Sequence, residues 1–133
     1  MIVVDSNVLA YLFLTCEFTP HAEALLLADP EWVAPMLWRS EFRNILAGYV
    51  RRKIITFEQA YELQREAENL LAGNEYAMDS LDVLTLVRDS DCSAYDCEFV
   101  ALAKRLGVRL ITLDKKVLNA FPLIAQSLRP AEH

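Results

Sequence analysis

Four acidic residues have the greatest potential for chemistry in this sequence: Asp5, Glu41, Asp96 and Asp114. They lie far apart along the chain, and each is flanked by apolar residues that we expect to be buried. A buried carboxylate without a partner is costly, so it needs a cation, a proton or hydrogen-bond donors. Four carboxylates in one cleft would repel one another, and a divalent cation would remove that conflict. Oxygen ligands without His or Cys favour Mg²⁺ or Mn²⁺, and such sites most often act on phosphate groups.

Asp96 lies in residues 93–106, which we predict to form a helix because the segment has no Gly or Pro and is followed by Gly107. At about 100° per residue, Asp96 falls on the apolar side of this helix, nearly opposite Glu98. We therefore expect its carboxylate to be buried and to need a partner. A second interpretation stays open, in which Ser93 and Asp96 form a capping box at the start of the helix.

Asp5 and Asp114 each come at the end of a short apolar run that is typical of a buried parallel strand. Both would then lie at the C-terminal ends of strands, which is the edge of an open parallel sheet where ligands bind. For Asp5 a role as a helix cap is equally open. We expect Ser6 or Asn7 to cap the helix that follows.

Glu41 lies early in the helix predicted for residues 35–52, nearer to its apolar side than to its basic side. Arg39 and Arg43 stand two positions before and after it, so neither faces Glu41 on the helix surface. Glu41 is therefore either a site residue or an acid at the border of the apolar face.

Strands and helices alternate along the chain, which indicates a three-layer α/β/α sandwich around a short, mainly parallel central sheet. We predict strands at residues 1–5, 32–34, 76–78, 108–113 and 123–126, and helices at 8–14, 19–27, 35–52, 56–72, 80–88, 93–106 and 115–121. The whole chain, residues 1–133, is predicted to be one domain, with 129–133 as a flexible tail.

Composition narrows the class of protein. The formal charge of −6 argues at first against a nucleic-acid partner, but less so if several acids bind metal. The apolar fraction of 54% favours a homo-oligomer with an apolar interface. The three Cys lack disulfide or zinc spacing and are expected to be buried, reduced thiols, and the two His are too far apart for a metal site and are expected at the surface. With no basic leader and no run long enough to span a membrane, we expect a soluble, cytoplasmic protein without a membrane partner.

The segments around the four acids resemble the acidic motifs of PIN-domain ribonucleases in order and spacing. They read VVDSNVL around Asp5, WRSEFRNIL around Glu41, AYDCEFVALA around Asp96 and ITLDKKV around Asp114. The small single-domain form is similar to the VapC toxins of toxin–antitoxin pairs. The resemblance implies Mg²⁺- or Mn²⁺-dependent endonucleolytic cleavage of RNA by a homodimer. It also implies inhibition by a cognate antitoxin whose C-terminal segment covers the acidic cleft.

By position, the resemblance makes Asp5 and Asp96 inner metal ligands, with Asp114 completing the cluster. Glu41 would hold metal-bound water or act as the base. Polar residues at matching positions beside the site are candidates for supporting roles: Ser6, Asn7 and Thr112.

Basic residues near these acids are candidates for contacts with RNA phosphates, or are solvated surface charge: Arg39, Arg43, Lys115 and Lys116. Many relatives carry a further acid or amide where this chain has Lys116, so the number of cations, one or two, stays open.

Two other classes of protein are considered. A phosphoacceptor receiver domain would need paired acids after the first strand, where this chain has a single Asp5. A PIN-like module that binds without catalysis would be favoured if the acids proved dispensable for cleavage.

Overall fold

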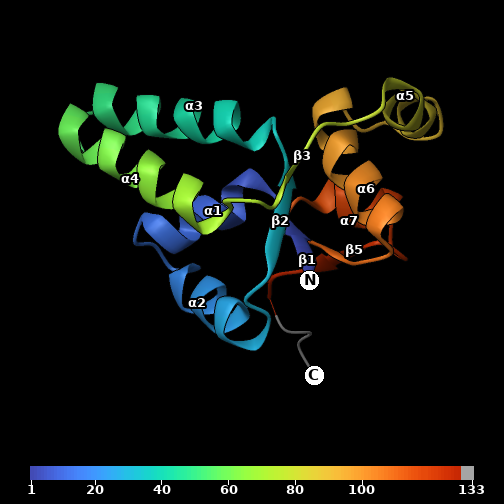
Figure 1. The fold of residues 1–133 in the computed structure, drawn as a ribbon, viewed down its shortest axis with the longest axis horizontal. Coiled ribbons are helices and arrows are strands. Elements are labelled where there is room, and N and C mark those ends of the chain that lie inside the picture. Colours follow the sequence, from blue (N-terminus) through green and yellow to red (C-terminus); the bar gives the residue numbers. More distant parts are fainter. Residues whose placement is uncertain (130–133) are drawn as a thin grey trace.

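The computed structural model describes residues 1–129 and contains a five-stranded sheet in which every pair of neighbours is parallel (Figure 1). The strands are β1 (Ile2–Val4), β2 (Trp32–Pro35), β3 (Glu75–Tyr76), β4 (Leu110–Thr112) and β5 (Ala125–Ser127). Their order is β3-β2-β1-β4-β5, so β1 lies in the centre between β2 and β4. The part of the predicted tail from residue 130 onward, including His133, lies outside the described residues.

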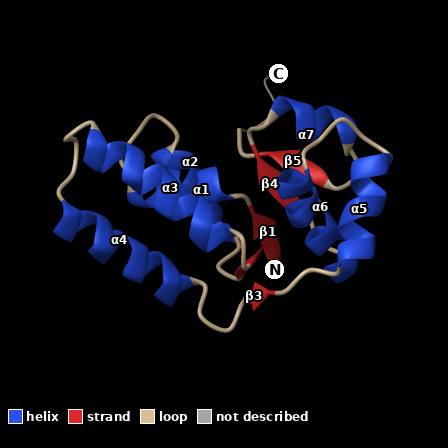
Figure 2. Cartoon of the chain, turned by 90° about the horizontal axis from the view of Figure 1, so that it is seen from above, coloured by secondary structure: helices blue, strands red, loops and turns tan. Residues whose placement is uncertain are grey.

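Helices cover both faces of this sheet. Within residues 1–129 they are α1 (Ser6–Phe13), α2 (Thr19–Ala28), α3 (Trp38–Arg51), α4 (Phe57–Leu70), α5 (Ser80–Arg88), α6 (Ala94–Leu106) and α7 (Lys115–Ala120). Helices α1 to α4 lie on one side of the sheet and α5 to α7 on the other (Figure 2). Helix α6 packs on β1, β2 and β4, whereas α3 and α4 pack on each other as a pair. The predicted three-layer α/β/α sandwich is confirmed.

The two central strands are buried on both faces because helices cover the sheet on either side. Every residue of β1 and β4 is at most 2% exposed. Five of these six residues are Val, Ile or Leu, and Thr112 is the polar exception. A buried hydroxyl needs a hydrogen-bond partner. Thr112 is the last residue of β4, and its hydroxyl finds a partner in Asp5, which follows β1 at the same edge of the sheet.

The strand-to-helix junctions after β1 and β4 are built by aspartates. Asp5 caps α1 by accepting a hydrogen bond from the backbone N–H of Val8 (2.9 Å). This result corrects the prediction that Ser6 or Asn7 would cap this helix, since the helix already begins at Ser6. Asp114 caps α7 in the same way. Asp is as good a cap as Ser or Asn, so these hydrogen bonds hold each carboxylate in place. Because β1 and β4 are parallel neighbours, both carboxylates lie at the same edge of the sheet.

Other predicted boundaries differ little from the observed ones. Helix α3 begins at Trp38 rather than at Pro35, because Pro35 is the last residue of β2. Gly107 ends α6 with a φ of 67°, as predicted, because this left-handed conformation is accessible to Gly at little cost. Of the cysteines, Cys92 and Cys97 are buried as predicted, whereas Cys16 is only partly buried; none forms a disulfide.

Several large apolar side chains are exposed in the described part of the chain. They include Phe57 and Tyr61 on α4 and Leu81 and Leu84 on α5. Exposed apolar groups of this kind are compatible with the predicted apolar interface, which stays a prediction. Within residues 1–129, no helix has both the length and the apolar character needed to cross a membrane.

Candidate functional site

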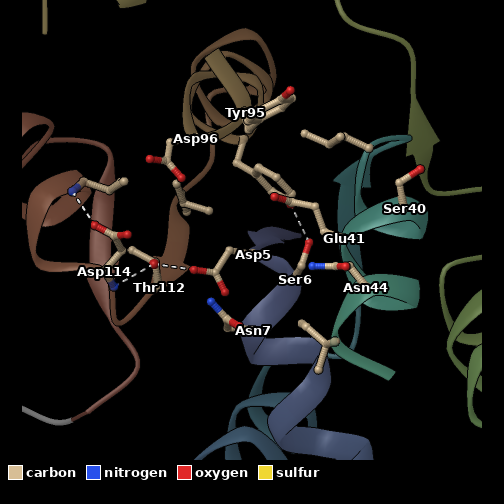
Figure 3. Close-up of a pocket in the computed structure, with 15 residues that line it drawn as sticks. Asp5, Ser6, Asn7, Ser40, Glu41, Asn44, Tyr95, Asp96, Thr112 and Asp114 are labelled. Atoms are coloured by element: carbon tan, nitrogen blue, oxygen red, sulfur yellow. Dashed lines mark hydrogen bonds between the residues drawn. The ribbon is translucent and has the colours of Figure 1, made fainter. Parts of the chain in front are cut away.

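All four predicted acids line one pocket of about 350 Å³ at the C-terminal edge of the sheet (Figure 3). Asp5 and Asp114 stand directly after β1 and β4, Glu41 lies in the first turn of α3, and Asp96 lies in the first turn of α6. Within the described residues, no Lys, Arg or His lines the pocket. Four separate segments thus bring negative charge into one cavity that no basic side chain of residues 1–129 lines.

Asp5 lies at the floor of the pocket and is the most strongly perturbed of the four acids. Burial raises its pKa from 3.8 to about 6. Hydrogen bonds from the Thr112 hydroxyl and the Val8 N–H counteract this rise, while the negative charges of Glu41 and Asp114 add to it. The ionised form of Asp5 therefore lacks sufficient compensation from the protein alone.

Thr112 connects the two strand ends that carry Asp5 and Asp114. Its hydroxyl donates a hydrogen bond to Oδ2 of Asp5 and accepts one from the backbone N–H of Asp114 (3.0 Å). The side chain is only 1% exposed, so both bonds are shielded from water. Thr112 therefore fixes the orientation of the Asp5 carboxylate, while its supporting role in the chemistry stays a prediction.

Glu41 is half-buried and oriented by Ser6, whose hydroxyl donates a hydrogen bond to Oε1 of Glu41 (2.8 Å). Burial raises the pKa of Glu41, the Ser6 hydrogen bond lowers it, and the charges of Asp96 and Glu98 raise it. Glu41 is therefore more than an acid at the border of a helix face. Its side chain lines the pocket, and the Ser6 hydroxyl donates a hydrogen bond that orients it.

Asp96 is half-buried, and this corrects the expectation that it would be fully buried. Half of the capping-box alternative is present, since the Ser93 hydroxyl accepts a hydrogen bond from the Asp96 backbone N–H (3.0 Å). Within residues 1–129 the Asp96 carboxylate itself makes no hydrogen bond or ion pair. It is therefore available to a ligand of the pocket.

The donor chemistry of the pocket suits a hard divalent cation. The polar side chains that line it offer carboxylate, amide and hydroxyl oxygens, without His or Cys. In the described part of the chain, no three acidic, His or Cys side chains lie close enough to form a ready-made cage. Mg²⁺ commonly binds through one or two carboxylates together with water and substrate phosphates, so an open set of acids fits it.

The basic residues predicted to contact RNA lie outside this pocket. Arg39 forms ion pairs with Glu68 (3.0 Å) and Glu75 (2.6 Å), so it joins α3 to α4 and β3 rather than facing the cavity. Arg43 is exposed on α3. The exposed pair at the start of α7, Lys115 and Lys116, directly follows Asp114.

Sequence reasoning missed further residues of the pocket. Ser40 and Asn44 lie on the same wall as Glu41, and Tyr95 stands at the mouth beside Asp96 (Figure 3). Glu98 of α6 does not line the pocket, but its negative charge raises the pKa of Glu41. Their closeness in sequence to Glu41 and Asp96 is the only signal that could have identified them.

Comparisons with known proteins agree with this architecture. The family model of the PIN domain matches residues 2–121. Ribonuclease VapC3 of Pyrobaculum aerophilum is 28% identical over 126 residues, which cover 92% of this chain and 96% of that protein.

Two solved structures share the fold. FitAB bound to a DNA fragment has a TM-score of 0.74 at 18% identity, with 100% of this chain and 99% of that chain covered. A toxin–antitoxin complex from Klebsiella pneumoniae has a TM-score of 0.72 at 17% identity, with 98% of this chain and 100% of that chain covered.

Proposed function

Because this chain belongs to the PIN domain family, we propose that it is an endoribonuclease that uses Mg²⁺ or Mn²⁺ to hydrolyse phosphodiester bonds of RNA. The observation that carries the proposal is the convergence of Asp5, Glu41, Asp96 and Asp114 on a pocket whose described lining contains no basic side chain. Such a pocket tolerates its charge when a cation is bound, and phosphate chemistry is the most frequent use of a cation held in this way. The similarity to a protein named as a ribonuclease supports RNA as the substrate.

The proposed mechanism divides the work among the residues of the pocket. Asp5 and Asp96 would hold the cation directly, with Asp114 completing the set. When bound, the cation would neutralise charge on the phosphoryl oxygens and make water more acidic. Thr112 keeps the Asp5 carboxylate turned toward the pocket through its hydrogen bond.

Glu41 is the candidate general base. Its pKa is raised by burial, which brings a carboxylate closer to the pH at which it accepts a proton efficiently. The Ser6 hydroxyl engages Oε1 and thereby leaves Oε2 as the oxygen that can accept a proton from water. Asn7 lines the same pocket and is proposed to support bound water or phosphate through its amide.

The phosphates of RNA also need positive charge outside the pocket. Lys115 and Lys116 are proposed to supply it, because both are exposed and follow Asp114 directly. Arg43 is a weaker candidate, and the ion pairs of Arg39 with Glu68 and Glu75 argue against its release for RNA.

We further propose that the protein is the toxin of a toxin–antitoxin pair, acts in the cytoplasm as a homodimer and is inhibited by a cognate antitoxin. The names of the Pyrobaculum and Klebsiella proteins support this role. Exposed apolar side chains on α4 and α5 would suit contacts with a second copy or with an antitoxin. Induced expression without the partner should arrest growth, and unaffected growth would contradict the toxin role.

The decisive test is to sequence RNA ends after expression of the wild type and of Asp96→Asn. The substitution removes a carboxylate that makes no hydrogen bond or ion pair within residues 1–129, so we expect a folded protein whose RNA cleavage falls at least about 100-fold. Asp91→Asn is the matched control, because Asp91 is an exposed acid of the preceding loop that does not line the pocket. Equal cleavage by Asp96→Asn and the wild type would reject the catalytic proposal and favour a module that only binds.

A further inference from the structure

Tyr95 differs from the other tyrosines in having no aromatic or guanidinium neighbour within residues 1–129. All five tyrosines lie in the described residues, and four have an aromatic or guanidinium neighbour: Tyr11 with Phe18, Tyr49 with Arg52, Tyr61 with Arg65 and Tyr76 with Arg105. Within residues 1–129, Tyr95 has no such neighbour, and its hydroxyl makes no hydrogen bond. Its side chain is also 62% exposed, so packing in the core does not explain it.

The position of Tyr95 connects this free ring with the acidic pocket. Tyr95 lies in the first turn of α6, next to Asp96, and lines the mouth of the pocket. In Figure 3 its ring stands above the cavity, between Asp96 on one side and Ser40 on the other. The opposite wall, from α3, contributes Ser40 and Asn44, whose side chains make no hydrogen bond within the described residues. A flat aromatic ring and groups that can donate and accept hydrogen bonds thus line the same pocket.

A nucleobase fits an exposed aromatic ring with amide and hydroxyl groups nearby. Its faces stack on aromatic rings, and its edge offers donors and acceptors to amides and hydroxyls. The described pocket lining is acidic and repels phosphates until a cation is bound, so contacts that do not depend on charge gain importance there. Stacking is such a contact, and it requires a base that is not already paired within a duplex.

We propose that Tyr95 is a stacking platform for an unpaired nucleobase next to the phosphate that is cut. The inference rests on the proposed ribonuclease function and deepens it, because it names the residue that positions a base beside the bond that is cut. Ser40 and Asn44 would contact the edge of the stacked base. Duplex RNA would bind poorly, since its bases cannot reach Tyr95 without unpairing.

Photocrosslinking tests the stacking contact independently of cleavage. A short single-stranded oligouridine that carries 5-iodouridine is irradiated with the Glu41→Gln variant, in which cleavage is expected to be slow, and the modified residue is identified by mass spectrometry. Stacked aromatic side chains react preferentially with this base. We expect the adduct on Tyr95, whereas an adduct confined to other residues, or none at all, would overturn the proposal.

Kinetics with single-stranded RNA test its contribution to binding. From the usual worth of a base–aromatic stack, Tyr95→Ala should raise KM about 5- to 100-fold with a small change in kcat. Tyr95→Phe should retain the wild-type KM, and Tyr95→Leu should resemble Ala because it lacks a π-face. Leu123→Ala is the control, since Leu123 is a 98% exposed apolar side chain outside the pocket and outside α4 and α5, and we expect no effect. An unchanged KM for Tyr95→Ala, or a loss in Tyr95→Phe equal to that in Ala, would overturn the proposal.

The outcomes separate this inference from the proposed function. If Tyr95 of Glu41→Gln crosslinks to the oligouridine but the wild type cuts no RNA, the ribonuclease proposal fails while the stacking site stands. If the wild type cuts RNA and Tyr95→Ala cuts it equally well, the stacking site fails and the ribonuclease proposal stands. Sedimentation of Tyr95→Ala must match that of the wild type, because a changed oligomeric state would assign Tyr95 to a protein interface and overturn the inference.

Discussion

Replacing Asp5 by Asn is expected to stabilise the protein when no divalent cation is present. Burial, with the charges of Glu41 and Asp114, raises the pKa of Asp5 from 3.8 to about 6. The folded chain therefore retains a proton that the unfolded chain has released, and the free energy of unfolding falls as the pH rises from about 4 to about 6. Asn does not ionise, can still accept the Val8 N–H hydrogen bond, and can donate its amide to the Thr112 hydroxyl.

The size of the effect follows from the shift in pKa. A change from 3.8 to about 6 corresponds to about 3 kcal/mol, at about 1.4 kcal/mol for each unit. This figure is an upper bound, because the Asp5 carboxylate faces an open pocket and water screens part of its charge. In a domain of 133 residues, about 3 kcal/mol corresponds to roughly 10 °C in melting temperature.

The assay is thermal unfolding of the wild type and Asp5→Asn with EDTA, between about pH 4 and about pH 8. The two proteins should melt within a few degrees of each other at the acidic end. The variant should melt up to roughly 10 °C higher at the alkaline end. Asp91→Asn serves as the control, since this exposed acid lies outside the pocket and should leave the curve unchanged. A wild type as stable as Asp5→Asn near pH 8 would refute the reasoning that the Asp5 charge opposes folding.

Three further perturbations probe the same pocket and its surroundings. Mn²⁺ at 100 times its Kd should raise the wild-type melting temperature by about 10 °C and leave Asp5→Asn unchanged, and equal shifts in both would place the ion elsewhere. Ser6→Ala removes the hydrogen bond that lowers the pKa of Glu41, so the acid limb of the kcat/KM profile against pH should move to higher pH; an unmoved limb would show that Glu41 is not the base. Arg39→Met breaks ion pairs to two glutamates of α4 and β3, so urea unfolding should show a loss of about 1–2 kcal/mol while RNA cleavage persists. A higher KM at unchanged stability would instead assign Arg39 to RNA.

The sequence predicted the strand ends well because their signals are local and strong. An apolar run that stops at an acid is short and unambiguous, and in a parallel sheet the C-terminal ends of strands share one edge. This argument alone placed Asp5 and Asp114 together. The sequence left two interpretations of Asp5 open, a helix cap or a site residue. In the structure its carboxylate both caps α1 and lines the floor of the pocket.

The helical residues of the pocket were harder to predict. Helix periodicity shows on which side of a helix a residue lies, but it does not show which residues of other elements that side contacts. It placed Glu41 and Asp96 near apolar faces, yet it could not show that Ser6 would orient Glu41 or that Tyr95 would stand over the opening. Arg39 illustrates the same limit. Its partners, Glu68 and Glu75, lie 29 and 36 positions away, and no local pattern indicates that α4 and β3 would bring them close.

The hydrogen bond between Thr112 and Asp5 joins residues 107 positions apart. During synthesis, β1 leaves the ribosome long before its neighbour β4, so a partly made chain carries Asp5 without the strand that orients it. The nascent protein is therefore chemically incomplete until β4 has inserted beside β1. A chain that ends before β4 therefore lacks both the hydroxyl that orients Asp5 and the Asp114 carboxylate of the same pocket.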